Sequence, residues 1–498
     1  MPRQSAADSA RTTPQLVRRG FPTTSPDQCE VPSPDRQWFA TEREFNLWLR
    51  SAADGRAAEL TTGGGPRTPW RVTGARWAPD GLTLAAIKLD TRAQRELPIV
   101  HWLKPAEEVE WVPYTRVGGA MQRSELYLID VLRRQPIRVR LDSADAMLSL
   151  IGWVSGDAEL LFYRMSRDFK QLDLLTADRR TGATRTVLTE RQPTFIKGIT
   201  SNPGWSELCT LLPDGNRFLW ISERDGWDHL YLYSLDGTLL HRLTTGSFPV
   251  LRVVSIDEPN GWVYFTAHAE PILYDTHLYR VRLDGTGFQR LTDGTGTHSV
   301  AFSPSKAFFL DTHSNVDRAP TVELRSADGR LVRVMSRANI DSLRALGWRP
   351  PEEFIVKAAD GVTDLYGVLY KPSDFDSTRR YPVIEYIYAG PHPVGDLYDH
   401  AALPTEGYMD LLHRNPEGYA HASSLRHAES LRGKLMLLHG TSDLNAPFSS
   451  TMKLVDALTR AGKPYDLRVF PELNRGLTGV VDYWYETHRR YFLEHLKP

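Results

Sequence analysis

Short runs in which apolar and polar residues alternate recur along the first two thirds of the chain. Five runs of similar sequence lie at 126–130, 172–175, 230–233, 278–281 and 322–324, so their first residues are 46, 58, 48 and 44 positions apart. An earlier run at 47–49 looks like another copy. A period of two is typical of strands that bury one face, so each run predicts a β-strand.

Turn signals separate these strands. Several copies lead into an Asp-Gly turn and a second apolar strand, as in LDGTLLHRLT from Leu235, LDGTGFQRLT from Leu283 and ADGRLVRVMS from Ala327. Pro-Asp-Gly turns at 79–81 and 213–215 lie between copies. Repeats of roughly 40–50 residues with about four strands each predict a β-propeller of at least six blades. A stacked β-sandwich would give irregular spacing instead.

The pattern changes at about residue 346. Strand-like segments at 354–357, 366–370 and 381–388 precede a buried-strand pattern at 434–438, and another strand is expected at 465–470. Between the last two, Ser449 is placed to cap a helix with Met452, Val455 and Leu458 on one face. The final helix carries one apolar stripe, formed by Val481, Trp484, Tyr485, His488, Tyr491 and Phe492. Alternating strands and helices predict an α/β unit with functional loops at the carboxyl ends of its strands.

Composition and charge exclude some classes of partner. The 498 residues are 41% hydrophobic and 24% charged, as in globular proteins of more than one unit. The formal net charge of −1 gives no electrostatic reason to expect nucleic acid or an anionic membrane. No apolar run approaches the length that spans a bilayer, so we expect neither nucleic acid nor a membrane as partner.

The first 38 residues are polar and broken by proline, without the apolar centre of a secretory signal. We therefore expect a disordered leader at 1–38 and favour a cytoplasmic protein. Cys29 and Cys209 are the only cysteines, too few for a disulfide framework and not spaced as metal ligands.

Four segments resemble one known family. They are IEYIYAGPH at 384–392, KLMLLHGTSDLNAPFSSTMKLVDAL at 434–458, and the stretches at 98–120 and 222–233. Together they resemble the dipeptidyl peptidase IV branch of the prolyl oligopeptidase family of serine peptidases. The resemblance implies an all-β propeller at 39–345 followed by a truncated α/β-hydrolase domain at 346–498. It also implies peptides as substrates, no cofactor, and a homodimer that the shortened second domain puts in doubt.

The family's chemistry uses a serine nucleophile, an aspartate and a histidine base, in that chain order. By resemblance, Asp443 is the triad acid and Asn445 contacts the substrate backbone. Tyr388 matches the tyrosine whose hydroxyl helps to form the oxyanion hole, although a core aromatic at a strand end is an equal reading. Tyr398 matches an aromatic residue of the substrate pocket.

The nucleophile has no counterpart in this sequence. None of its glycines begins a G-x-S-x-G elbow: the run from Gly204 ends in Leu208, and the run from Gly440 ends in Leu444. The family has several βα units after its AGPH segment, whereas here 390–393 leads straight into VGDLYD at 394–399. The elbow and the strand beneath it are therefore missing together.

The base is lost separately. After the expected strand at 465–470, the run PELNRG places Arg475 where the family has its histidine. A guanidinium stays protonated at working pH, so it cannot accept the proton of a serine. His488 is near in sequence but lies on the apolar helix stripe. We expect Arg475 to pair with Asp443 and neutralise that carboxylate.

Three functional hypotheses remain. The first is a dipeptidyl peptidase IV-like homologue that has lost catalysis, and the second is a propeller scaffold that binds peptides or a protein partner. The third is an internally deleted copy of an active aminopeptidase, although restoring the missing stretch would leave Arg475 in place. A metal enzyme is disfavoured, because the 15 histidines lack ligand spacing and no H-E-x-x-H occurs. The loss of central strands also predicts a second domain less stable than the propeller.

Overall fold

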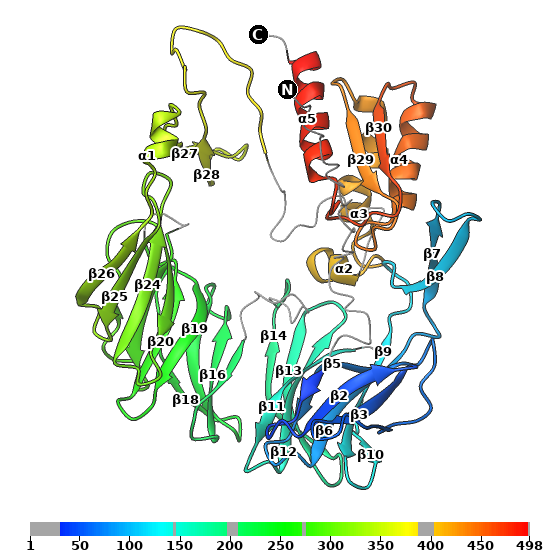
Figure 1. Ribbon diagram of the computed structural model, residues 1–498, viewed down its shortest axis with the longest axis vertical. Coiled ribbons are helices and arrows are strands. Elements are labelled where there is room, and N and C mark those ends of the chain that lie inside the picture. The colour runs from blue at the N-terminus through cyan, green and yellow to red at the C-terminus, as the bar shows by residue number, and fades with distance from the viewer. Residues whose placement is uncertain (1–29, 143–145, 197–207, 271–274, 387–402, 497–498) are drawn as a thin grey trace, which may run out of the picture.

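The computed structural model describes residues 30–142, 146–196, 208–270, 275–386 and 403–496. Two bodies are visible, a β-rich lower body and a smaller α/β upper body (Figure 1). Residues 1–29 of the expected leader lie outside the described residues, and the first strand already begins at Val31. The expected domain boundary at 346 falls between the last strand of the lower body and the first strand of the upper one.

The lower body consists of six four-stranded sheets. Sheet 1 contains β1 (Val31–Pro32), β2 (Trp38–Arg43), β3 (Asn46–Ser51) and β4 (Ala57–Glu59). Sheet 2 contains β5 (Trp70–Trp77), β6 (Thr83–Asp90), β9 (Arg123–Asp130) and β10 (Gln135–Arg138). Sheet 3 contains β11 (Ala146–Val154), β12 (Glu159–Ser166), β13 (Gln171–Asp178) and β14 (Thr184–Arg191).

Three more sheets follow in chain order. Sheet 4 contains β15 (Cys209–Leu211), β16 (Arg217–Ser222), β17 (His229–Ser234) and β18 (Leu239–Arg242). Sheet 5 contains β19 (Val250–Asp257), β20 (Trp262–Ala267), β21 (His277–Arg282) and β22 (Gln289–Arg290). Sheet 6 contains β23 (Thr297–Phe302), β24 (Phe308–Ser314), β25 (Thr321–Ser326) and β26 (Leu331–Arg337). These six sheets confirm the prediction of a propeller with at least six blades.

Each copy of the sequence repeat forms the third strand of its sheet. The six runs fall in β3, β9, β13, β17, β21 and β25. In β17 the run Leu230 to Tyr233 is entirely buried, whereas in β25 buried and half-buried residues alternate. The repeat in sequence therefore corresponds to one position in each sheet.

Hydrophobic clusters join neighbouring sheets into an arc. One cluster links sheets 1 and 2 around Trp70, and a second links sheets 2 and 3 around Phe162. A large cluster around Trp220 joins sheets 3, 4 and 5, and a fourth around Phe309 joins sheets 5 and 6. Among the described residues, none of these clusters links sheet 6 back to sheet 1.

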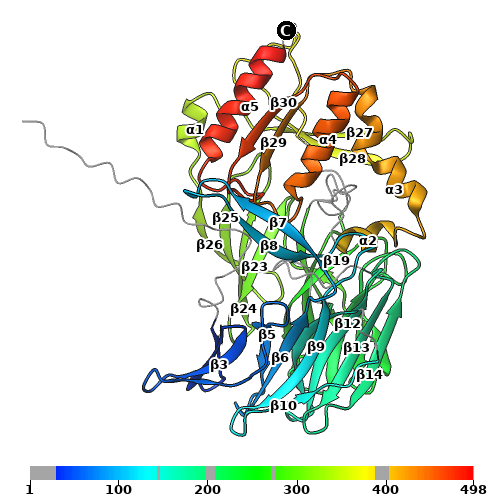
Figure 2. The ribbon, with the colours of Figure 1, turned by 90° about the vertical axis from the view of Figure 1, so that its right-hand side faces the viewer.

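A hairpin leaves the propeller between β6 and β9. It consists of β7 (Arg95–His101) and β8 (Glu108–Tyr114), which pair with each other and not with sheet 2. The hairpin projects toward the upper body, beneath β29 and α5 (Figure 2). It overlaps the 98–120 segment that resembles the family, and it reaches the site described below.

The upper body is built from few strands. A hairpin of β27 (Glu352–Lys357) and β28 (Asp364–Leu369) follows α1 (Asp341–Ala345). The parallel pair β29 (Met436–Gly440) and β30 (Asp466–Phe470) is connected by α4 (Phe448–Arg460) and followed by α5 (Val481–His495). Between these parts lie α2 (Leu403–Met409), α3 (Pro416–Ala422) and the 3-10 helix η2 (Ser424–Ser430). The alternation of strands and helices is the one expected, and the described strands of the upper body form two separate pairs.

One expectation about the strands of the upper body is corrected. The strand expected at 381–388 is not formed over 381–386, where Val383, Ile384 and Tyr386 are exposed and no strand pairs with them. A strand needs a neighbour for its backbone hydrogen bonds, and in the described residues none is provided. The apolar stripe expected on α5 is present: four of its side chains are half-buried, whereas Val481 and Tyr485 are exposed.

The predicted cap of α4 is corrected as well. The helix begins at Phe448, with Pro447 in the N-cap position and no side-chain capping bond. Ser449 therefore lies inside the first turn. Proline is suited to a helix start because it lacks the N–H that the first turn leaves unpaired.

Helix α2 anchors the upper body to sheet 3 of the propeller. Glu406 is 1% exposed and accepts hydrogen bonds from the Gly118 backbone N–H, at 2.7 Å, and from the Arg167 guanidinium. Lys170 pairs with Asp410 at 2.5 Å, beyond the end of the helix. These contacts hold the region immediately before α3 and β29 against the propeller.

Packing around Tyr408 completes this contact. Its ring lies edge-on to Phe169 at 6.4 Å and to Phe195 at 5.0 Å between ring centroids. Gly407 has no space for a side chain, since a Cβ there would lie 2.3 Å from the Phe169 ring. Burial raises the pKa of Tyr408 to about 12, so its hydroxyl stays protonated in the interface.

Candidate functional site

Asp443 lies directly after β29, at the carboxyl end of the parallel pair. Its side chain is 4% exposed. The carboxylate accepts hydrogen bonds from the backbone N–H groups of Asn445, at 2.8 Å, and Ala446, at 3.0 Å. The acid is therefore held in a turn that leads into α4, with one oxygen committed to the backbone.

His439 lies on β29 beside this carboxylate. Its Nε2 is 2.8 Å from the Ala446 carbonyl oxygen, and its Nδ1 is 2.6 Å from the Thr451 hydroxyl. A carbonyl can only accept, so Nε2 carries the proton and Nδ1 accepts from Thr451. The Asp443 carboxylate is 3.7 Å from the same Nε2. The Nε2 of His439 thus holds the loop that carries Asp443, and the Nδ1 holds α4 against β29.

The loop that carries Arg475 is bonded to the Asp443 loop. The Ser442 N–H donates to the Leu473 carbonyl at 3.0 Å, and the Glu472 N–H donates to the Thr441 hydroxyl at 2.8 Å. Gly440 makes this approach possible, because a Cβ at this position would lie 2.2 Å from the Leu473 carbonyl oxygen. The structure therefore brings together the two loops that the sequence assigned to the acid and the base.

The pairing of Arg475 with Asp443 stays a prediction. Arg475 is half-buried, and the neighbours described for the Asp443 carboxylate are two backbone N–H groups and His439. An imidazole in place of Arg475 could accept a proton, whereas the guanidinium there can only donate hydrogen bonds.

The propeller hairpin closes one side of the site. The Tyr114 hydroxyl, at the end of β8, donates to the Asn445 carbonyl at 3.4 Å, and the Leu103 N–H donates to the Glu472 carboxylate at 3.1 Å. Burial raises the pKa of Tyr114 to about 12, and the negative charge of Asp443 contributes in the same direction. Tyr114 was not predicted as a site residue, although it lies in the 98–120 segment that resembles the family.

Other predicted site residues cannot be placed. Tyr388 and Tyr398 lie outside the described residues, as does the Gly204-Trp205-Ser206 run. Asn445 is exposed, and its backbone N–H and carbonyl are bonded as described above. The described part of the site thus supplies an acid, a cation and a tyrosine, and within that part no serine lies on a nucleophile elbow.

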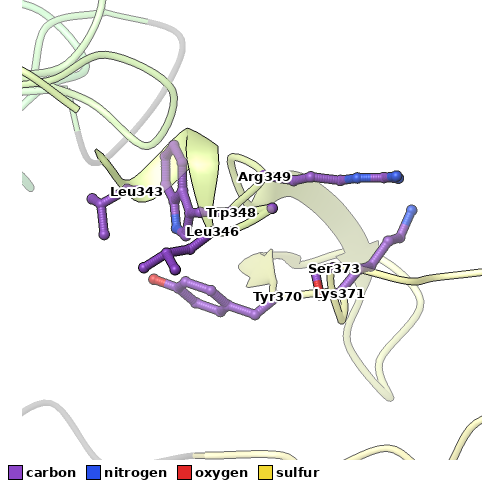
Figure 3. Close-up of a pocket in the computed structure, with 8 residues that line it drawn as sticks. Leu343, Leu346, Trp348, Arg349, Tyr370, Lys371 and Ser373 are labelled. Carbon is purple, nitrogen blue, oxygen red and sulfur yellow. The ribbon is translucent and has the colours of Figure 1, made fainter. Parts of the chain in front are cut away.

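A shallow pocket lies elsewhere, where the propeller joins the upper body. It has a volume of about 340 Å³ and is lined by Leu343 of α1 and by the segments that follow α1 and β28, with Leu346, Trp348 and Tyr370 turned toward one another (Figure 3). Figure 1 places α1 and β28 on the opposite side of the upper body from β29 and α4. The pocket is therefore separate from the Asp443 site.

A group of possible metal ligands was also missed. Asp311, His313 and Glu323 of sheet 6 place ligand atoms within 4.8 Å of one another, and all three residues are buried. Two of them lie on β24 and the third on β25. No contiguous motif reveals this group, because strand pairing assembles it.

Family models match both bodies of the chain. Residues 6–320, more than half of the chain, match the model described as the dipeptidyl peptidase IV N-terminal region. Residues 391–498 match the model of the prolyl oligopeptidase family. No helix in the described residues is long and apolar enough to cross a membrane.

Curated relatives are longer than this chain. The probable dipeptidyl-aminopeptidase B of Emericella nidulans is 26% identical over 407 residues, covering 72% of this chain and 44% of the relative. The protein of the same name from Aspergillus clavatus is 25% identical over 390 residues, covering 70% and 42%. The chain thus spans less than half the length of these two relatives.

Solved structures show the same fold. The Porphyromonas gingivalis dipeptidyl peptidase 4 superposes with a TM-score of 0.84 at 19% identity, covering 94% of this chain and 82% of that one. A putative dipeptidyl aminopeptidase IV from Bacteroides ovatus gives a TM-score of 0.82 at 19% identity, covering 95% and 84%. At this identity the likeness shows the fold alone: a propeller followed by a truncated hydrolase domain. With the family matches, it follows that the chain belongs to the dipeptidyl peptidase IV branch of the prolyl oligopeptidase family.

Proposed function

We propose that this member of a peptidase family no longer hydrolyses peptides through a Ser-His-Asp triad. The observation that carries the proposal is the absence of a G-x-S-x-G elbow from the 498-residue sequence. The elbow exposes the serine hydroxyl and also supplies an oxyanion-hole N–H from the following residue. Without it, both the attacking group and one stabilising donor are missing.

Arg475 supports the same conclusion independently. It follows β30, in the loop bonded to the Asp443 loop, where the family pattern expects the base. Removing triad members from a serine peptidase lowers kcat by roughly 10⁴–10⁶. We therefore expect the rate of peptide hydrolysis by a chain without nucleophile and base to lie at the lower limit of detection.

The retained contacts favour binding as the remaining function. The propeller keeps six complete sheets, and buried Glu406 still anchors the reduced hydrolase domain to sheet 3. We propose that the protein binds peptides or a protein partner on this framework. Peptides with a free amino terminus are the ligand class to test first, since the family's substrates carry one.

Two assays on the full-length protein test the loss of catalysis. Ala-Pro and Gly-Pro chromogenic substrates should give no release above buffer, and a serine-directed fluorophosphonate probe should leave the protein unlabelled. An active dipeptidyl peptidase assayed in parallel is the positive control. Release of product by pure protein, together with labelling, would overturn the proposal.

Calorimetry tests the binding function separately. Peptides with a free amino terminus should bind, and the same peptides with an acetylated amino terminus should bind at least tenfold more weakly. No heat of binding at millimolar peptide would remove peptides as ligands, whatever the outcome of the activity assays.

A further inference from the structure

We propose that sheet 6 of the propeller contains a structural site for a divalent transition-metal ion such as Zn²⁺. Its ligands are His313, Glu323 and Asp311, and His298 orients the Asp311 carboxylate. The site is separate from Asp443 and does not depend on the proposed loss of catalysis.

Strand pairing places these side chains on one face. His298 of β23 lies opposite His313 of β24, and Asp311 of β24 lies opposite Glu323 of β25. His313 and Asp311 are two residues apart on the same strand, so both point to the same face. Three adjacent strands therefore direct imidazole and carboxylate groups into one buried layer.

The burial of this layer is almost complete. Asp311 is 0% exposed, His298 3%, and His313 and Glu323 7% each. Buried polar groups normally have hydrogen-bond partners, and leaving one unpaired costs about 1–3 kcal/mol. Each donor and acceptor in a cluster buried to this degree is therefore expected to have a partner.

Several ring nitrogens of the histidines in this layer have no hydrogen-bond partner. Both ring nitrogens of His313 and the Nε2 of His298 are buried and have no hydrogen-bond partner. His298 Nδ1 lies 2.9 Å from both Asp311 oxygens, so it donates to that carboxylate and its Nε2 is left as a lone pair. Neutral His313 likewise has a buried lone pair with nothing to bind.

The charges do not balance either. Two buried carboxylates, Asp311 and Glu323, face one buried guanidinium, Arg325. Arg325 donates to Glu323 at 2.8 Å and to Asp293 at 2.8 Å, and its Nε is 3.6 Å from the Asp311 carboxylate. Since exposed Asp293 shares this guanidinium, the buried layer keeps an excess of negative charge. A bound cation would compensate it.

Protonation of His313 would pair these buried groups less well than a bound metal ion would. The Nε2 of His313 is 3.6 Å from the Glu323 carboxylate, which is longer than a hydrogen bond. Protonation would also turn Nδ1 into a second buried N–H donor, and no acceptor lies within reach of it. A metal ion instead accepts a lone pair from the imidazole and attracts both carboxylates. Imidazole with carboxylate is a ligand set that suits zinc and related ions.

The geometry is close to that required. Ligand bonds of about 2.0–2.2 Å put two ligand atoms at most about 4.4 Å apart. The atoms of Asp311, His313 and Glu323 lie within 4.8 Å, so small side-chain rotations bring them to an ion. His277 lies beside His298 with ring centroids 4.7 Å apart and ring planes tilted by 34°, and burial lowers its pKa to about 4, so it adds no competing positive charge.

Such an ion would fasten the last sheet of the arc. One face of sheet 6 packs on sheet 5 around Phe309, whereas Phe308 and Leu310 on the other face are exposed. A sheet covered on one side has less apolar burial to hold its strands together. A metal ion bridging β24 and β25 would add a cross-link that the packing lacks.

Titration of chelator-treated full-length protein tests the site. Calorimetry with Zn²⁺ should show one equivalent bound with Kd below micromolar, and the melting temperature should rise by several degrees. Mg²⁺ should give neither effect, because it prefers all-oxygen ligands. Co²⁺ substitution should give the visible absorption of a low-coordinate site with a nitrogen ligand.

Variants separate this site from other histidines. His313→Ala should lower the zinc affinity at least a hundredfold, and Glu323→Gln at least tenfold, with circular dichroism showing retained folding. His241→Ala, at an exposed histidine on β18, is the matched control and should bind as the wild type. No zinc binding by wild type, or equal binding by His313→Ala and wild type, would overturn the proposal. A melting temperature that rises only on acidification would assign the cluster to protonation instead.

Discussion

Glu406 shows how much one buried side chain contributes to the arrangement of the two bodies. It is 1% exposed, yet its two oxygens are used by a backbone N–H of the Gly118 turn and by Arg167. A buried ion pair is not a large net source of stability, because desolvation offsets its attraction. Removing one partner is costly, since the other charge is left buried and unpaired.

We expect Glu406→Ala to lower the free energy of unfolding by about 3–5 kcal/mol, because Arg167 would lose its counter-charge in the interface. Urea denaturation followed by tryptophan fluorescence measures this loss. Glu417→Ala, at an exposed position in the first turn of α3, is the matched control and should change stability by less than about 0.5 kcal/mol. Equal effects of the two substitutions would show that α2 does not anchor the hydrolase domain.

At the scale of elements, the hydrolase domain exposes many large apolar side chains. All residues of β27 are exposed, and Ile355 is 58% exposed. The parallel pair β29 and β30 has no further strand beside it in the described residues. An isolated two-stranded pair is marginally stable, so this domain depends on its contacts with the propeller.

Limited proteolysis should therefore cleave the region after residue 346 first. Local opening governs cleavage, and openings require less free energy where few apolar contacts are broken. Low trypsin concentrations followed by mass spectrometry should give a resistant fragment that contains sheets 2 to 5. Simultaneous cleavage throughout the chain, or uniform resistance, would contradict the expected difference in stability.

Some secondary-structure elements were predicted correctly from the sequence and others were not. The third strands of the blades were found because they repeat similar residues at a regular spacing, as at Leu230 to Tyr233. The segment at 381–386 was expected to be a strand on its apolar composition, but composition does not provide a neighbouring strand. The stripe of α5 was found correctly, and the structure leaves Val481 and Tyr485 on it exposed.

At the scale of the whole molecule, catalysis would need three loops on one continuous sheet. The structure retains the loops of Asp443 and Arg475, joined through Ser442 and Leu473. The third loop, which would carry the nucleophile, has no counterpart in the sequence.

Restoring the base alone should not restore activity. Arg475→His places an imidazole in the loop beside Asp443, but no serine elbow faces it in the sequence. Hydrolysis of Gly-Pro and Ala-Pro substrates should stay at the level of the wild type and of an Arg475→Gln control. A rise of tenfold or more in Arg475→His alone would reveal a nucleophile outside the expected motif and would contradict the proposed loss.

The sequence by itself determined the repeat of strands and the family, because both depend on residues close together in the chain, and it predicted Asp443 as the acid. Only the tertiary structure decided which distant groups meet. Glu406 meets Arg167 across 239 positions, and Tyr114 meets Asn445 across 331. His313, Asp311 and Glu323 come together through the pairing of two strands, β24 and β25. Such contacts depend on how sheets pair and pack, and local periodicity carries no information about either.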